Sequence, residues 1–211
     1  NSLFIITEIF YGLKSQSLAL IADAAHNAGD VIGLLVAWLG YWLASKKAPK
    51  KFTYGYKNTT IIAAFINAVL LFVAVGGIIW EAVQRLGIDQ PIASTTVITV
   101  ACAGVVINGL TAFFFFHDRH NDINIQGAFM HMILDALVSF GVIFAGLFML
   151  WTSWFWIDSI VSLIIVTVVL LGSWGLFKES LNLILLAVPT SIDIEKLRTT
   201  IFEFQGLIDI H

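Results

Sequence analysis

Two stretches of the 211-residue chain repeat one arrangement of ionisable side chains. His26 precedes Asp30 by four positions, and His131 precedes Asp135 by the same interval, each within an otherwise apolar run. On an α-helix, residues at i and i+4 share a face with Cβ atoms about 5–6 Å apart, so each pair could offer an imidazole nitrogen and a carboxylate oxygen to one ion. Two such helices packed face to face would supply four ligands, the number that tetrahedral Zn²⁺ takes.

The charges of this quartet (His26, Asp30, His131 and Asp135) would balance around a divalent cation. Two carboxylates are negative and two neutral imidazoles carry no charge, so a dication brings the cluster to zero, the least costly way to hold it in apolar surroundings. Either pair alone has an ordinary interpretation as interhelical hydrogen-bonding groups. Both pairs together, each central to an apolar run, favour a metal site.

The composition indicates a membrane protein. Hydrophobic residues make up 59% of the chain, charged residues 12%, and the mean hydropathy is +0.92, whereas soluble proteins average about 45–50% and about 25%. So much apolar surface must face lipid. This excludes a disordered chain, a nucleic-acid binder, a secreted disulfide scaffold and an ordinary cytosolic enzyme. The lone Cys102 permits neither an internal disulfide nor a thiolate metal cluster.

The apolar runs predict an all-α, six-helix transmembrane bundle. A span needs roughly 20 apolar residues, and five runs of that kind cover residues 17–44, 59–84, 93–116, 124–151 and 154–178. Leu3 to Gly12 is too short for a span and is interpreted as the end of a first helix whose beginning is missing from the sequence. We expect a transmembrane domain over residues 1–188 and the start of a cytoplasmic C-terminal domain over 189–211, where charged residues alternate with apolar ones.

Lysines indicate the orientation. Five of the eleven cationic residues (Lys46, Lys47, Lys50, Lys51 and Lys57) lie in one connection. By the positive-inside rule this connection is cytoplasmic. An even number of crossings then places both termini in the cytoplasm.

Other polar residues have less specific interpretations. Asp23 and Asn27 precede and follow His26 and are candidates for an outer shell around the metal, with a helix-entry or interhelical role as the alternative. His117, Asp118 and His120 could form a secondary metal site at the cytoplasmic mouth, or a solvated loop. Glu8 is expected to be buried only if its helix is complete, and the tryptophans before Asp158 place Asp158 at the membrane interface.

Several motifs resemble the cation diffusion facilitator family of zinc transporters. They are the segment from Ser17 to Asp30, the Phe52-Thr-Tyr-Gly-Tyr56 motif, the segment from Asn124 to Asp135, Asp158-Ser159 and the segment from Leu186 to Pro189. They occur in the family's order along nearly the whole chain.

The resemblance implies a homodimeric carrier that exports Zn²⁺, and also Cd²⁺ or Co²⁺, from the cytoplasm in exchange for H⁺. It implies that His26, Asp30, His131 and Asp135 are the transport ligands and that Zn²⁺ is the transported substrate. The short connection at 117–122 favours a bacterial protein of the cytoplasmic (inner) membrane. Two alternatives remain at this point, an intramembrane metalloenzyme and a metal-free proton channel that uses the same side chains.

Overall fold

The computed structural model describes residues 2–46, 58–88, 90–119, 122–188 and 192–202, and all the regular structure in these ranges is helical. Phe52-Thr-Tyr-Gly-Tyr56 and the predicted domain boundary at 188/189 fall on or beside residues outside these ranges, so that boundary stays a prediction. The helices are α1 (Ser2–Ser15), α2 (Leu18–Ala44), α3 (Thr59–Arg85), α4 (Ser94–Phe115), α5 (Ile123–Thr152), α6 (Trp156–Ile184) and α7 (Ile194–Phe202).

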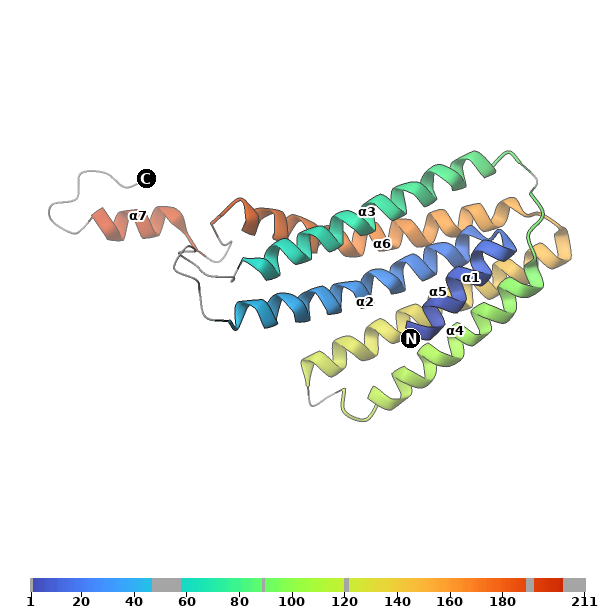
Figure 1. The fold of residues 1–211 in the computed structure, drawn as a ribbon, viewed down its shortest axis with the longest axis horizontal. Helices are drawn as coiled ribbons and strands as arrows, with labels where there is room; N and C mark the ends of the chain where they lie inside the picture. The colour runs from blue at the N-terminus through green and yellow to red at the C-terminus, as the bar shows by residue number, and fades with distance from the viewer. Residues whose placement is uncertain (1, 47–57, 89, 120–121, 189–191, 203–211) are drawn as a thin grey trace.

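The five long helices confirm the predicted transmembrane bundle. Each of α2 to α6 is long and apolar enough to cross a membrane. Their ends agree with the predicted spans to within two residues, except that α6 continues to Ile184, six residues beyond the predicted end. The least apolar span is α2, because it carries Asp23, His26 and Asp30. α1 has 14 residues and reaches from the middle of the bundle to the end where it turns into α2 (Figure 1).

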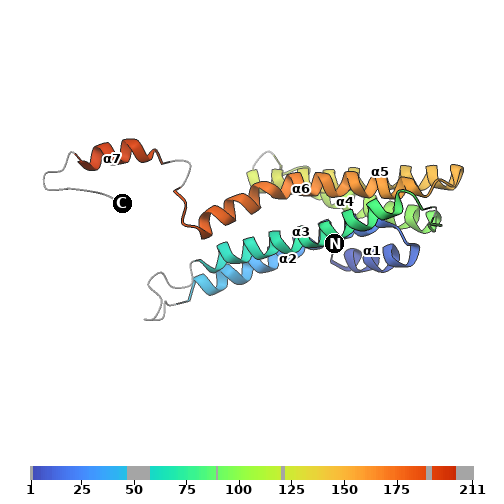
Figure 2. The ribbon, with the colours of Figure 1, turned by 90° about the horizontal axis from the view of Figure 1, so that it is seen from above.

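Two groups of helices make up the bundle. α2, α3 and α6 pack against one another, while α4 and α5 form a closely packed antiparallel pair (Figures 1 and 2). α1 joins the groups by packing on both α2 and α4, and α2 touches α5 over only a short stretch. α7 lies beyond the end of the bundle and has no buried side chain among its described residues.

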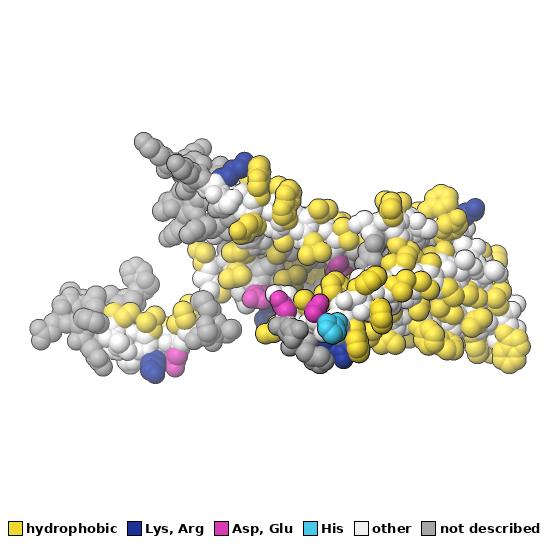
Figure 3. Space-filling model, turned by 90° about the horizontal axis from the view of Figure 1, so that it is seen from below, with side chains coloured by type: hydrophobic (Ala, Val, Ile, Leu, Met, Phe, Trp, Pro, Cys, Tyr) yellow, Lys and Arg dark blue, Asp and Glu magenta, His cyan; other side chains and the backbone are white. Residues whose placement is uncertain are grey.

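Apolar side chains cover the outside of the long helices. Large residues such as Trp38, Phe114 and Trp151 are exposed. Hydrophobic side chains cover much of the face drawn in Figure 3. A water-soluble protein rarely exposes contiguous apolar area on this scale, so these faces are surfaces for lipid. The chain is an integral membrane protein.

Asp158, near the start of α6, is hydrogen-bonded to the start of α2. Its buried carboxylate accepts hydrogen bonds from the Ser17 hydroxyl at 2.5 Å and from the Leu18 amide at 2.5 Å. Free amides at a helix N-terminus attract a negative group. Asp158 is therefore a buried cap for a neighbouring helix, a role that its place after the tryptophans did not predict.

Candidate metal centre

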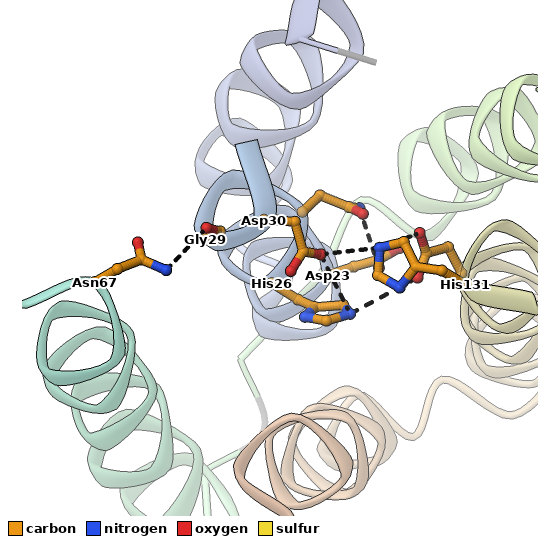
Figure 4. Close-up of polar contacts among 8 residues, drawn as sticks. Asp23, His26, Gly29, Asp30, Asn67 and His131 are labelled. Atoms are coloured by element: carbon orange, nitrogen blue, oxygen red, sulfur yellow. Dashed lines mark hydrogen bonds and ion pairs between the residues drawn. The ribbon is translucent and has the colours of Figure 1, made fainter. Parts of the chain in front are cut away.

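The structure brings the four predicted ligands together in the short stretch where α2 meets α5. His26 and Asp30 project from α2, and His131 and Asp135 project from α5 (Figure 4 labels the first three). The i, i+4 spacing on each helix gives one face with two polar groups, and the crossing of the helices turns these faces toward each other. The imidazole rings of His26 and His131 lie 5.8 Å apart between centroids.

Each imidazole contacts one oxygen from each carboxylate. Nε2 of His131 lies 3.2 Å from Oδ2 of Asp30 and 3.5 Å from Oδ2 of Asp135. Nε2 of His26 lies 3.7 Å from Oδ2 of Asp30 and 3.7 Å from Oδ1 of Asp135. Nitrogen and oxygen atoms thus alternate along these four contacts, and one donor atom from each of His26, His131 and Asp135 lies within 4.8 Å of the other two. Asp30 adjoins this group of three through its contacts with both imidazoles.

These separations fit a small tetrahedral cation. Bonds of about 2.0–2.1 Å at tetrahedral angles place neighbouring ligand atoms about 3.3 Å apart. Two oxygens of the quartet, Oδ2 of Asp30 and Oδ2 of Asp135, are buried and lack a hydrogen-bond partner within the described part of the chain. Oδ2 of Asp30 still lies 3.2 Å from Nε2 of His131. Buried carboxylate oxygens normally have partners, and a bound cation could satisfy both of these.

An apolar groove leads to the quartet. It has a volume of about 690 Å³ and runs between α5 and α6, with Val138, Val161 and Val168 among its lining residues. His131 and Asp30 are 38% and 42% exposed, whereas Asp135 is 3% exposed. One side of the quartet is therefore open, and Asp135 forms its buried side.

The two predicted outer-shell residues contact each other. The Asp23 carboxylate is buried and accepts hydrogen bonds from the Ser139 hydroxyl at 3.1 Å and the Asn27 amide at 3.5 Å. Neither donor is an imidazole. That Asp23 and Asn27 serve as an outer shell for the metal stays a prediction.

α3 supports the α2 segment that carries the ligands. The Asn67 amide donates to the backbone carbonyl of Gly29 at 3.4 Å, next to Asp30 in the sequence (Figure 4). A Cβ atom on Gly33, one turn further along, would lie 2.9 Å from the Asn67 amide nitrogen. The absence of a side chain at Gly33 thus lets α3 approach α2 behind the site.

The predicted secondary site remains untested. His117 and Asp118 are exposed beyond the end of α4, and His120 lies outside the described residues. Sequence reasoning also gave Glu8 no role. In the structure Glu8 is fully buried although α1 is short, so its expected dependence on a complete helix is wrong.

The chain matches a known family over most of its length. The family model described as "Cation efflux transmembrane domain" covers residues 1–185.

Bacterial relatives extend this match. The chain is 35% identical over 210 residues to a protein of Bacillus subtilis named "Cadmium, cobalt and zinc/H(+)-K(+) antiporter", covering 99% of this chain and 68% of that protein. It is 38% identical over 197 residues to "Zinc transporter ZitB" of Pectobacterium atrosepticum, covering 92% of this chain and 61% of the relative. It is 36% identical over 208 residues to "Metal cation efflux system protein CzcD" of Cupriavidus metallidurans, covering 99% of this chain and 66% of the relative.

The match and the fold agree. The aligned residues include all six helices of the bundle and the quartet between α2 and α5, and they span about two-thirds of each relative's length. These relatives are named as transporters rather than enzymes, which confirms the prediction that the chain is not an enzyme. The chain belongs to the cation efflux family and forms its transmembrane domain.

Proposed function

We propose that this domain moves divalent transition-metal cations, Zn²⁺ above all, out of the cytoplasm in exchange for H⁺, with His26, Asp30, His131 and Asp135 as the transport ligands. The convergence of two nitrogens and two carboxylates at separations of 3.2–3.7 Å carries the proposal. The relatives' names, which include zinc, cadmium, cobalt and H⁺, support it.

Exchange follows from the chemistry of the ligands. A metal binds neutral imidazole and ionised carboxylate, so loading the quartet expels protons and acidification expels the metal. Imidazole ordinarily titrates near pH 6.5 and can respond to physiological changes. Exporting a dication against an inside-negative potential costs about 4.6 kcal/mol per 100 mV, and the return of protons offsets that cost.

The ligand set also determines which ions compete. Imidazole nitrogens favour Zn²⁺, Cd²⁺ and Co²⁺, whereas Mg²⁺ and Ca²⁺ prefer shells made of oxygen. Excess Mg²⁺ should therefore leave Zn²⁺ uptake unchanged, and displacement of Zn²⁺ by Mg²⁺ would contradict the assignment.

Proteoliposomes with an enclosed pH indicator test the proposal directly. A Zn²⁺ gradient should drive proton flux with the unmodified protein, and His26→Ala or Asp135→Ala should abolish it. Glu81→Gln is the control, because Glu81 lies at the far end of α3, paired with Arg85. Flux at the unmodified level in both ligand variants would overturn the site assignment.

We further propose that both termini face the cytoplasm, that the membrane is the bacterial inner membrane, and that the protein is a homodimer. The lysine-rich connection supports the orientation, and the bacterial relatives support the membrane. With Cys102 replaced by Ser, Lys46→Cys should react with an impermeant maleimide only in inside-out vesicles. The mass of the detergent-purified protein tests the dimer.

A further inference from the structure

A second acidic cluster lies deeper in the bundle than the quartet. Glu8 of α1 and Asp23 of α2 have 0% and 1% of their surfaces exposed, and their carboxyl groups face each other. Asp23 lies three residues before His26 on α2, and Ser139, its hydrogen-bond donor, lies four residues after Asp135 on α5. The cluster is therefore displaced by about one helical turn from the quartet, toward the turn between α1 and α2.

Glu8 has little around it that could stabilise a negative charge. Both of its carboxyl oxygens are buried without a hydrogen-bond partner in the part of the chain that the structure describes. The groups that face it are Asp23 and Asn27 on α2 and, at longer range, Asp135 on α5. α4, which also packs on α1, carries no Asp, Glu, His, Lys or Arg between Ser94 and Phe115.

Asp23 has more hydrogen-bond donors than Glu8 to stabilise a negative charge. Its carboxylate accepts hydrogen bonds from the Ser139 hydroxyl and the Asn27 amide, and at longer range it faces His26 and Asp135. Asp23 can therefore be the ionised partner of the pair, because the donor that faces Glu8, the Asn27 amide, also donates to Asp23, while the Ser139 hydroxyl donates to Asp23.

Two adjacent carboxyl groups in a dry interior do not both ionise, because like charges at close range repel and burial penalises each charge. A proton on Glu8 removes the repulsion and the cost of burying a charge on Glu8, and the neutral acid can donate to the Asp23 carboxylate. Such a pair carries one negative charge in place of two.

We propose that Glu8 and Asp23 form a proton-binding site of their own, separate from the metal quartet, which holds one shared proton in the state described here. This inference rests on the proposed transport function for its role in the cycle. The quartet is open to the groove along α6, whereas Glu8 and Asp23 are fully buried on the side where α1 packs on α2 and α4. When the cycle opens that side, water reaches the pair, Glu8 ionises, and its proton passes to the water. Reprotonation then accompanies closure.

Infrared spectroscopy of the metal-free protein at neutral pH detects the protonated carboxyl group directly. The unmodified protein should show the carbonyl band of a buried, protonated carboxyl group. Glu8→Gln should remove this band, and Glu81→Gln should leave it. A spectrum without the band in the unmodified protein, or with the band intact in Glu8→Gln, would overturn the proposal.

Transport assays test the role of the proton. Gln stays neutral and can still donate to Asp23, so Glu8→Gln imitates the protonated pair and cannot ionise. It should bind Zn²⁺ as the unmodified protein does, yet transport it at least about tenfold more slowly, because opening becomes limiting. Glu8→Asp, which keeps an ionisable group, should restore part of the rate. A Glu8→Gln protein that transports at the unmodified rate would contradict the role.

The experiments can disprove the transport site and the Glu8–Asp23 proton site independently of each other. If the quartet is not the transport site, His26→Ala and Asp135→Ala keep their Zn²⁺ flux, whatever the infrared band shows. If Glu8 and Asp23 share no proton, the band is absent while the quartet variants still lose flux. Should Glu8→Gln fail to bind Zn²⁺, the infrared comparison still decides the matter, because both spectra are recorded on metal-free protein.

Discussion

The Asp30 carboxylate of α2 lies 3.2 Å from Nε2 of His131 on α5, closer than the 3.7 Å that separates it from Nε2 of His26 on its own helix. Asp135 also contacts both imidazoles, at 3.5 Å from His131 on its own helix and 3.7 Å from His26 on α2. Each carboxylate bridges the two helices, so the four donors depend on one another through the packing of α2 on α5.

The bridging geometry predicts that Asp30 and His131 act together. Asp30→Ala or His131→Ala alone should weaken Zn²⁺ binding by more than the 10–100-fold that the loss of an outer-shell partner costs. The double variant should be less than tenfold weaker than either single variant, because the first loss already removes the shared geometry. Calorimetric titration measures all three, and fully additive losses would contradict the coupling.

Binding should depend steeply on pH. Protons compete with the metal for both imidazoles, whose ordinary pKa is near 6.5. Zn²⁺ affinity should therefore be nearly constant above about pH 7.5 and fall as the pH drops, approaching about a hundredfold per unit below about pH 6, when two protons must leave for each metal bound. Titrations between pH 5.5 and 8 check this dependence, and an affinity that rises on acidification would contradict it.

Asp158→Ala should destabilise the fold without removing the metal site. The substitution leaves the Ser17 hydroxyl and the Leu18 amide buried without an acceptor, a loss of about 2–3 kcal/mol. Thermal unfolding in detergent should show a lower midpoint, with the Zn²⁺ affinity of the folded protein nearly unchanged. Asp193→Ala is the matched control, since Asp193 accepts from the Lys196 amide at an exposed helix start and its loss should cost under about 1 kcal/mol.

Two glycines of α4 should respond oppositely to alanine. A Cβ atom on Gly104 would lie 2.8 Å from the Ser139 hydroxyl and 3.1 Å from the Phe4 ring, whereas Gly109 has nothing within 4 Å. Gly104→Ala should therefore cost about 1–3 kcal/mol through overpacking. Gly109→Ala should be neutral or stabilising by up to about 1 kcal/mol, because alanine favours the helix. Equal unfolding midpoints for the two variants would show that α4 is not closely packed at Gly104.

The features that could be predicted from the sequence are those that depend on the order of apolar and polar residues along a single helix. The ends of α2 to α5 followed from where apolar runs meet polar residues, and the candidate quartet followed from one spacing that occurs twice. The end of α6 did not, because the predicted span stopped at residue 178, where the charged pair Lys178-Glu179 interrupts the apolar run, whereas the helix continues through this pair to Ile184.

Contacts between segments far apart in the sequence could not be predicted from the pattern along a single helix. Asp158 caps a helix whose first residue lies 140 positions earlier, and Glu8 meets Asp23 only because α1 folds back onto α2. An ionisable residue within an apolar run indicates that some partner exists, but its identity depends on which helices cross. The sequence predicted an interface position for Asp158 and a conditional burial for Glu8, and it identified neither residue's partner.

Because α2 touches α5 over only a short stretch, an ion bound by the proposed quartet would also have a structural role. Four coordination bonds there would add a link between the α4–α5 pair and the other three long helices, which otherwise meet through α1 and through the contact of α5 with α6. A bound ion would then also hold the two groups of helices together. Release of the ion would remove this link just when the α4–α5 pair has to move relative to α2, α3 and α6. Proteases should therefore cleave the metal-free protein faster than the metal-bound protein.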